Sequence, residues 1–153
     1  LLLGGLLLSG FVAGFLATVI FHQLAVALLS VVGIAPVSAF NTDPVPPLGV
    51  PSFLSLAFWG GVWGIIFALV HTRFPTGGGY WGTALVFGAV LPSLVALLVV
   101  VPLKGGPVGA GWQPQVWLFA ALVNGAWGIG TALFLRLLPG HAALQRRSPR
   151  QRG

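Results

Sequence analysis

Two polar side chains stand together in a long apolar run near the start of this 153-residue sequence. They are His22 and Gln23, within the stretch TVIFHQLAV, and a third polar residue, Asn124, interrupts a later apolar run. An imidazole can ligate a metal or carry a proton, and the side-chain amides can orient a polar ligand. These three residues are the first candidates for a binding site.

Two tryptophans, Trp63 and Trp127, are the aromatic candidates. Each lies in the middle of an apolar run, too deep for an interfacial position. Such rings could wall a pocket for a quinone, a carotenoid or a tetrapyrrole, with His22 as an axial ligand. A bis-histidine haem is not expected, because His71 lies at the end of its run and His141 lies in the C-terminal tail. No cofactor is predicted, and these three classes stay open as alternatives.

The chain lacks the residue combinations that are typical of an enzyme. It has no cysteine and a single acidic residue, Asp43. Paired carboxylates, thiol nucleophiles and clustered metal ligands are therefore excluded. No HExxH or phosphate-binding loop is present either. The sequence predicts neither catalysis nor a metal site.

The composition indicates a membrane protein. Apolar residues make up 57% of the chain and charged residues only 5%, against about 25% in a typical soluble domain. The net charge of +6 does not indicate nucleic-acid binding, because five of the seven basic residues lie at the C-terminal end. Four of them, Arg146, Arg147, Arg150 and Arg152, form a basic tail suited to anionic lipid or an acidic partner.

An all-α fold with four transmembrane helices follows from the apolar runs. A bilayer core of about 30 Å needs about 20 apolar residues in a helix. We expect spans at about 10–32, 51–70, 81–101 and 116–138, separated by segments rich in proline and glycine, and Leu1–Ser9 is open as an extension of the first helix. Residues 1–140 then form one transmembrane domain, and residues 141–153 a tail expected to be disordered.

Basic residues predict the orientation of these spans. Arg73 and the C-terminal arginines would share one side, whereas the other side holds Lys104 and Asp43. The positive-inside rule then places both termini in the cytoplasm of a bacterium, with the protein in the inner membrane. A cleaved signal peptide ending near Val37–Ala39 is the alternative, but its apolar run would be unusually long and no basic segment precedes it.

Glycine patterns predict how the helices pack. Small residues four apart allow close helix approach, and spans 2 and 4 contain several such positions. The sequence also repeats itself, since GVWGIIFAL (61–69) and GAWGIGTAL (125–133) agree at six of nine positions. This similarity favours a tandem duplication of a two-helix hairpin, with chance similarity as the alternative. The predicted packing residues are Gly60, Gly61, Gly64, Gly125 and Gly128.

The polar candidates lie at similar depth in the predicted spans. With span 1 centred near Phe21, both His22 and Gln23 fall within one turn of the midplane, and Asn124 lies about 4.5 Å from the centre of span 4. Unpaired amides are costly in hydrocarbon, so these groups should face the interior and bond to one another or to the carbonyl that Pro92 frees. They then act as contacts between helices, as a ligand site or as part of a transport path.

The stretch TDPVPPLGVPSFLSLAFWGGVWG, together with FHQ in span 1, resembles a family of small, uncharacterised, multi-span inner-membrane proteins of proteobacteria. The resemblance covers most of the chain and implies location and topology, but no activity.

These features together predict an accessory subunit that helps assemble or stabilise a larger membrane complex, of which respiratory and photosynthetic complexes are the examples considered. The expected partners are the lipid bilayer and other membrane subunits, and no nucleic acid. A small channel or transporter with a midplane polar site is one alternative, and a binder of a lipophilic cofactor is the other.

Overall fold

The structure, a computed structural model, describes residues 2–138 and contains four long helices. The first combines α1 (Leu2–Ala17), a π-helical turn (Thr18–His22) and α2 (Gln23–Val31). The second is α3 (Ser52–Val70), which ends in a 3₁₀ turn at His71–Arg73. These two helices and the two described next are each long and apolar enough to cross a membrane, as the sequence predicted.

The other two long helices follow a short loop. α4 (Gly78–Val95) continues through a second π-helical turn (Ala96–Val100) into α5 (Val101–Leu103). α6 (Pro114–Leu137) is the last helix. The first helix extends further toward the N-terminus than the span expected at 10–32, whereas the other three start and end within three residues of expectation.

Proline and glycine set the helix boundaries. Proline is tolerated in the first turn of a helix, where its missing N–H costs nothing, and Pro114 occupies that position in α6. Gly33 ends α2 with φ +74°, a conformation that favours glycine because it has no side chain. The loop after it forms a small antiparallel hairpin from β1 (Pro44–Val45) and β2 (Val50–Pro51).

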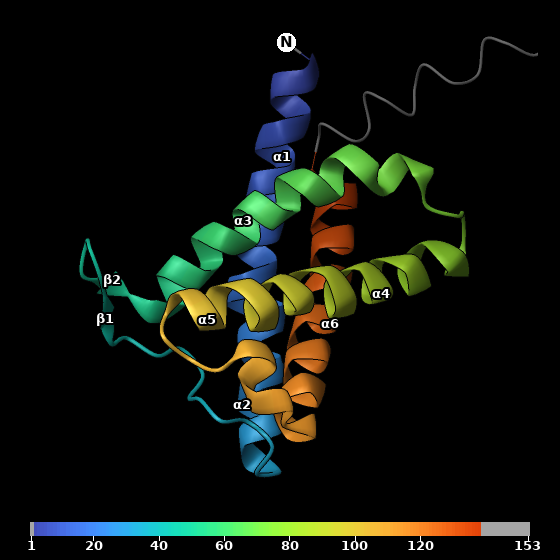
Figure 1. The fold of residues 1–153 in the computed structure, drawn as a ribbon. Coiled ribbons are helices and arrows are strands. Elements are labelled where there is room, and N and C mark those ends of the chain that lie inside the picture. Colours follow the sequence, from blue (N-terminus) through green and yellow to red (C-terminus); the bar gives the residue numbers. More distant parts are fainter. Residues whose placement is uncertain (1, 139–153) are drawn as a thin grey trace, which may run out of the picture.

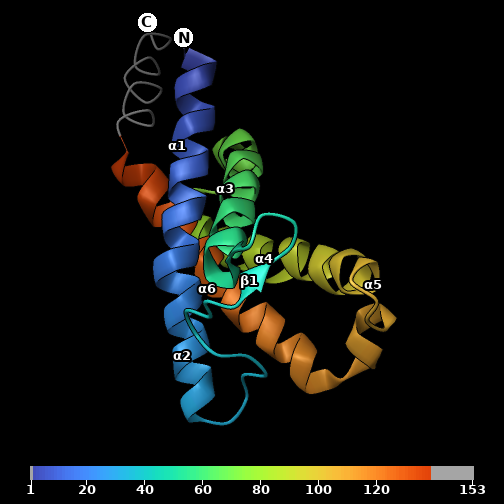
Figure 2. The ribbon, with the colours of Figure 1, turned by 90° about the vertical axis from the view of Figure 1, so that its left-hand side faces the viewer.

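The helices form two closely packed pairs. α3 packs on α1, and α4 packs on α6. α1 and α6 run in opposite directions and join the two pairs (Figure 1), and α6 crosses α1 obliquely (Figure 2). α3 and α4 make few backbone contacts with each other. The fold is therefore two helix pairs joined along one side rather than an evenly packed bundle.

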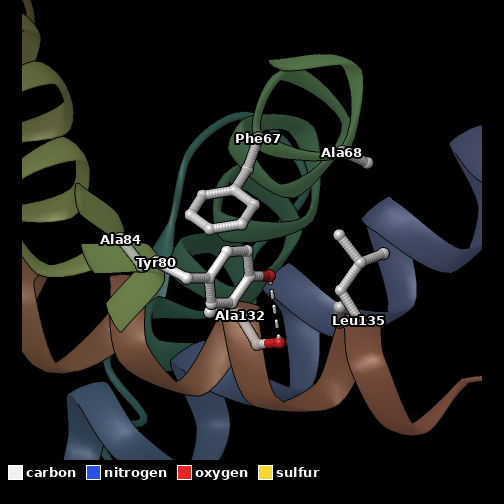
Figure 3. Packing of buried hydrophobic residues seen from close by; sticks show 7 residues of the cluster. Phe67, Ala68, Tyr80, Ala84, Ala132 and Leu135 are labelled. Carbon is white, nitrogen blue, oxygen red and sulfur yellow. Dashed lines mark hydrogen bonds between the residues drawn. The ribbon is translucent and has the colours of Figure 1, made fainter. Parts of the chain in front are cut away.

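The buried hydrophobic cluster lies where α3 ends, α4 begins and α6 ends, and α1 adds Ala13 to it. Besides alanines and Leu135, it contains two aromatic rings, Phe67 and Tyr80, which lie next to each other between α3, α4 and α6 (Figure 3). Phe67 also makes edge contacts with Phe74, Phe87 and Trp127. These rings fill the space that separates α3 from α4.

The outer surface of the long helices is apolar. Exposed side chains include Leu28 at 70%, Trp59 at 58% and Val86 at 58%. In water such a surface would be strongly unfavourable, whereas in a bilayer the lipid tails cover it.

Candidate functional site

His22 and Gln23 lie at the junction of the π-helical turn and α2, and both are buried. The side-chain amide nitrogen of Gln23 lies 3.5 Å from Nδ1 of His22. The amide oxygen of Gln23 accepts a hydrogen bond of 2.6 Å from the backbone N–H of Phe40. Gln23 therefore fixes the loop between α2 and α3 against the first helix, a partner that the sequence did not predict.

The two π-helical turns have separate local causes. Thr18 donates its hydroxyl to the carbonyl oxygen of Gly14, four residues earlier, at 3.0 Å. Such side-chain bonds to a preceding carbonyl compete with the regular helical pattern. In α4, Pro92 removes one backbone donor just before the turn that begins at Ala96. Inserted π-helical turns are frequent at functional sites, which keeps His22 among the candidate ligand contacts.

Asn124 has a different partner from the one expected. Its side-chain nitrogen donates to the hydroxyl of Ser93 at 3.0 Å, which links α6 to α4. No hydrogen bond joins Asn124 to His22 or Gln23 in residues 2–138. The three polar candidates thus fall into two groups, His22 and Gln23 between the first helix and the loop, and Asn124 between α4 and α6.

The helix that contains His22 is longer than the expected span. Its apolar part runs from Leu3 to Val31, so its centre is near Ala17. His22 lies about 7–8 Å from this helix centre, at 1.5 Å per residue, on the side of the loop that Gln23 binds. The position of His22 in the bilayer stays a prediction.

Trp63 and Trp127 lie in different surroundings. Trp127 is buried, with 3% of its surface exposed, and its Nε1 donates to the carbonyl oxygen of Gly14 at 3.0 Å. Trp63 is partly buried and makes an edge contact with Phe87 of α4, with ring centroids 6.4 Å apart. Both rings contribute to helix packing, Trp127 between α6 and α1 and Trp63 between α3 and α4.

The glycines of spans 2 and 4 lie at helix contacts. A Cβ on Gly60 would overlap the hydroxyl of Thr18, and one on Gly64 would overlap the carbonyl oxygen of Gly10. Gly61 lies against the ring of Phe11. Close backbone contact therefore joins α1 and α3.

The second helix pair uses the same kind of contact. A Cβ on Gly128 would overlap the carbonyl oxygen of Ala84, and Gly125 lies against the side chain of Leu85. The partner glycines Gly10, Gly14 and Gly88 were missed from the sequence, although Gly10 and Gly14 have the same four-residue spacing.

Two other sequence predictions concern the metal and the tail. Within residues 2–138, no three histidine, aspartate or glutamate side chains lie close enough to hold a metal ion. The basic residues Arg146, Arg147, Arg150 and Arg152 lie outside the described part of the chain.

Comparison with known proteins adds no relative. No family model matches the chain, and no curated protein or solved structure matches it. The resemblance to small inner-membrane proteins of proteobacteria therefore stays a prediction.

Proposed function

We propose that this protein is a non-catalytic accessory subunit of a bacterial inner-membrane complex, which it helps to assemble or stabilise. The main support is that three polar side chains of its helices are bonded within the chain. Gln23 bonds to the loop, Asn124 to Ser93, and Trp127 to the backbone of α1. Among the described residues, no fully buried side-chain nitrogen or oxygen lacks a partner. Bonds of this kind suit a structural role better than a site for substrate.

The outer surface supports the same function. Once glycine contacts have closed the helix pairs, the exposed apolar surface of α3 and α4 remains for lipid or neighbouring subunits. We place both termini in the cytoplasm, because Arg73 and the C-terminal arginines then lie inside.

A tandem duplication accounts for the two helix pairs. A Cβ on Gly14 of α1 would meet Gly60 and Gly64 of α3, and one on Gly88 of α4 would meet Asn124 and Gly128 of α6. The α3 and α6 positions are 64 residues apart in both cases, which is the offset of the sequence repeat. The shared offset in α3 and α6 supports a duplicated hairpin over chance similarity, although the partner glycines Gly14 and Gly88 are 74 residues apart.

The native mass of the protein tests the proposed function. The protein, tagged at its C-terminus, is extracted from its membrane in a mild detergent, and its mass and co-purifying polypeptides are measured. A stoichiometric set of larger membrane polypeptides is expected. A monomer or small homo-oligomer alone, obtained reproducibly in several mild detergents, would contradict the proposal.

His22 supports a second candidate function, the binding of a lipophilic ligand. It lies in a π-helical turn, and its Nε2 has no hydrogen-bond partner within residues 2–138. When Nδ1 accepts the proton of the Gln23 amide, Nε2 carries a proton and can donate it to a carbonyl group such as that of a quinone. A channel or transporter is less well supported, because Gln23 and Asn124 are already bonded within the chain.

The ligand is tested on the purified protein. We expect a quinone or a pigment in solvent extracts of the wild type, less of it in His22→Ala, and an unchanged amount in His71→Ala, which alters a histidine at the other end of the spans. A wild-type preparation without extractable quinone or pigment would exclude this second function.

A further inference from the structure

Arg136 is held against two aromatic rings at the end of α6. The central carbon of its guanidinium group lies 4.1 Å from the ring centroid of Tyr80 and 5.2 Å from that of Trp81. A cation above an aromatic face is attracted by the ring electrons. Although its side chain is exposed, the guanidinium is therefore placed by specific contacts.

The rings that hold Arg136 are themselves fixed. The hydroxyl of Tyr80 donates to the carbonyl oxygen of Ala132 at 3.5 Å (Figure 3). Its ring also contacts those of Phe74 and Trp81, with centroids 6.0 Å and 5.5 Å away. The first turn of α4 and the last turns of α6 thus hold the cation at the end of the spans.

Within residues 2–138, no acidic side chain forms an ion pair with Arg136. The single acidic side chain of the sequence, Asp43, lies in the loop between α2 and α3, directly before β1. A guanidinium group carries five N–H donors in a planar fork that matches the oxygens of a phosphate. This guanidinium is therefore open to an anion from outside the described residues.

We propose that Arg136, held over Tyr80 and Trp81, binds the phosphate group of an anionic phospholipid. Tyrosine and tryptophan are typical of the level at which lipid headgroups lie, and basic sites between membrane helices bind anionic headgroups. The neighbouring Leu137, 70% exposed, offers an apolar surface to the acyl chains. This site does not depend on the accessory-subunit function.

Lipid binding is measured on the full-length protein by native mass spectrometry. The protein is offered an equimolar mixture of phosphatidylglycerol and phosphatidylcholine. We expect the wild type to retain phosphatidylglycerol about fivefold better, which corresponds to one basic residue at a membrane surface. No preference in the wild type would overturn the proposal.

Variants at one end of the spans locate the site. Arg136→Gln should lose most of the preference, and Arg136→Lys, which keeps the charge without the fork, should lose part of it. Arg73→Gln is the matched control, because Arg73 is an exposed basic residue at the end of α3. Arg73→Gln should keep the preference for phosphatidylglycerol. The basic tail is the same in every variant, so it does not affect the comparison. If Arg136→Gln and Arg73→Gln lose the preference for phosphatidylglycerol equally, or if Arg136→Gln loses none of it, the lipid is held by diffuse electrostatic attraction. Either result would contradict a specific site at Arg136.

Inorganic phosphate distinguishes a lipid site from a general anion site. We expect phosphate at millimolar concentration to leave the retained phosphatidylglycerol unchanged. If phosphate displaces the lipid completely and raises the thermal stability of the protein as much as phosphatidylglycerol does, the assignment to phospholipid is wrong. Should both Arg136 variants fail to fold, Trp81→Leu, which removes one ring and keeps the cation, is expected to lower the preference, and an unchanged preference would contradict the proposal.

Discussion

The indole nitrogen of Trp127 donates a hydrogen bond to the carbonyl oxygen of Gly14, which joins the last long helix to the first. The same oxygen accepts the hydroxyl of Thr18, so one carbonyl serves two side chains. Gly14 also has no side chain that would separate α1 from α3. Three helices therefore meet at this residue.

Removing the Trp127 donor should weaken the contact between α6 and α1. Trp127→Phe keeps an aromatic ring and loses the N–H, while Gly14 keeps its bond from Thr18. Hydrogen bonds between membrane helices contribute about 0.6 kcal/mol on average, and we expect a loss of that size or somewhat more, because the smaller ring also leaves a gap. Thermal unfolding in detergent measures it. Trp59→Phe, on the exposed face of α3, is the control, and an equal loss in both variants would contradict this prediction.

Two glycines of α4 should differ sharply in their tolerance of a methyl group. A Cβ on Gly88 would overlap the carbonyl oxygen of Asn124, whereas Gly82 has open space around it. Gly88→Ala should therefore lower stability by about 1–3 kcal/mol, the usual cost of overpacking, and Gly82→Ala should leave it unchanged or slightly higher. Thermal unfolding of the two variants tests the contact directly. Similar stability of the two variants would show that α4 and α6 do not approach this closely.

The bond between Asn124 and Ser93 calls for a double-mutant cycle. Asn124→Leu and Ser93→Ala should each destabilise the protein, because each leaves a polar group of the other residue unpaired. The double variant should lose less than the sum, by a coupling of about 0.6 kcal/mol. Additive losses would mean that the two side chains act independently.

Gln23 should control the loop between α2 and α3. Gln23→Leu removes the acceptor of the Phe40 N–H, so hydrogen exchange at that amide should become faster while α3 stays protected. Gln115→Leu is the matched control, because Gln115 donates to the carbonyls of Gly33 and Ile34 and gives Phe40 no acceptor. Unchanged exchange at Phe40 in Gln23→Leu would show that the loop is held by other contacts.

The sequence predicted helices better than contacts between them. Apolar runs of about twenty residues bounded by proline and glycine have few alternatives to a membrane helix, so the four long helices were found. The bond between Gln23 and Phe40 was not predicted, because Phe40 is seventeen residues away in an irregular loop and offers a backbone group that any residue could supply. Asn124 was identified as a polar position, but periodicity gives no information on which helices are neighbours, so its bond to Ser93 was not predicted.

Local backbone irregularities were also beyond prediction. The segment before α6 turns with positive φ at Gly109, Ala110, Gly111 and Trp112. Trp117 supports this turn by donating to the carbonyl oxygen of Gly109 at 2.9 Å, and its ring stacks on that of Trp112. Left-handed conformations are unfavourable for residues with side chains, so no propensity favours this conformation at Ala110 and Trp112. Only the contacts of the folded chain make it stable.

The pairing of the helices has a consequence for biosynthesis. The contacts of α1 with α3, and of α4 with α6, join helices that follow one another, so each hairpin can close soon after it leaves the ribosome. The bond between Gly14 and Trp127 spans 113 residues and waits for the final helix. Until then one side of α1 is without α6, and lipids or an insertion factor must cover it. Translation that stops before α6 would leave the α1–α3 hairpin and an unpaired α4, with the surfaces that contact α6 open to neighbouring proteins and to proteases.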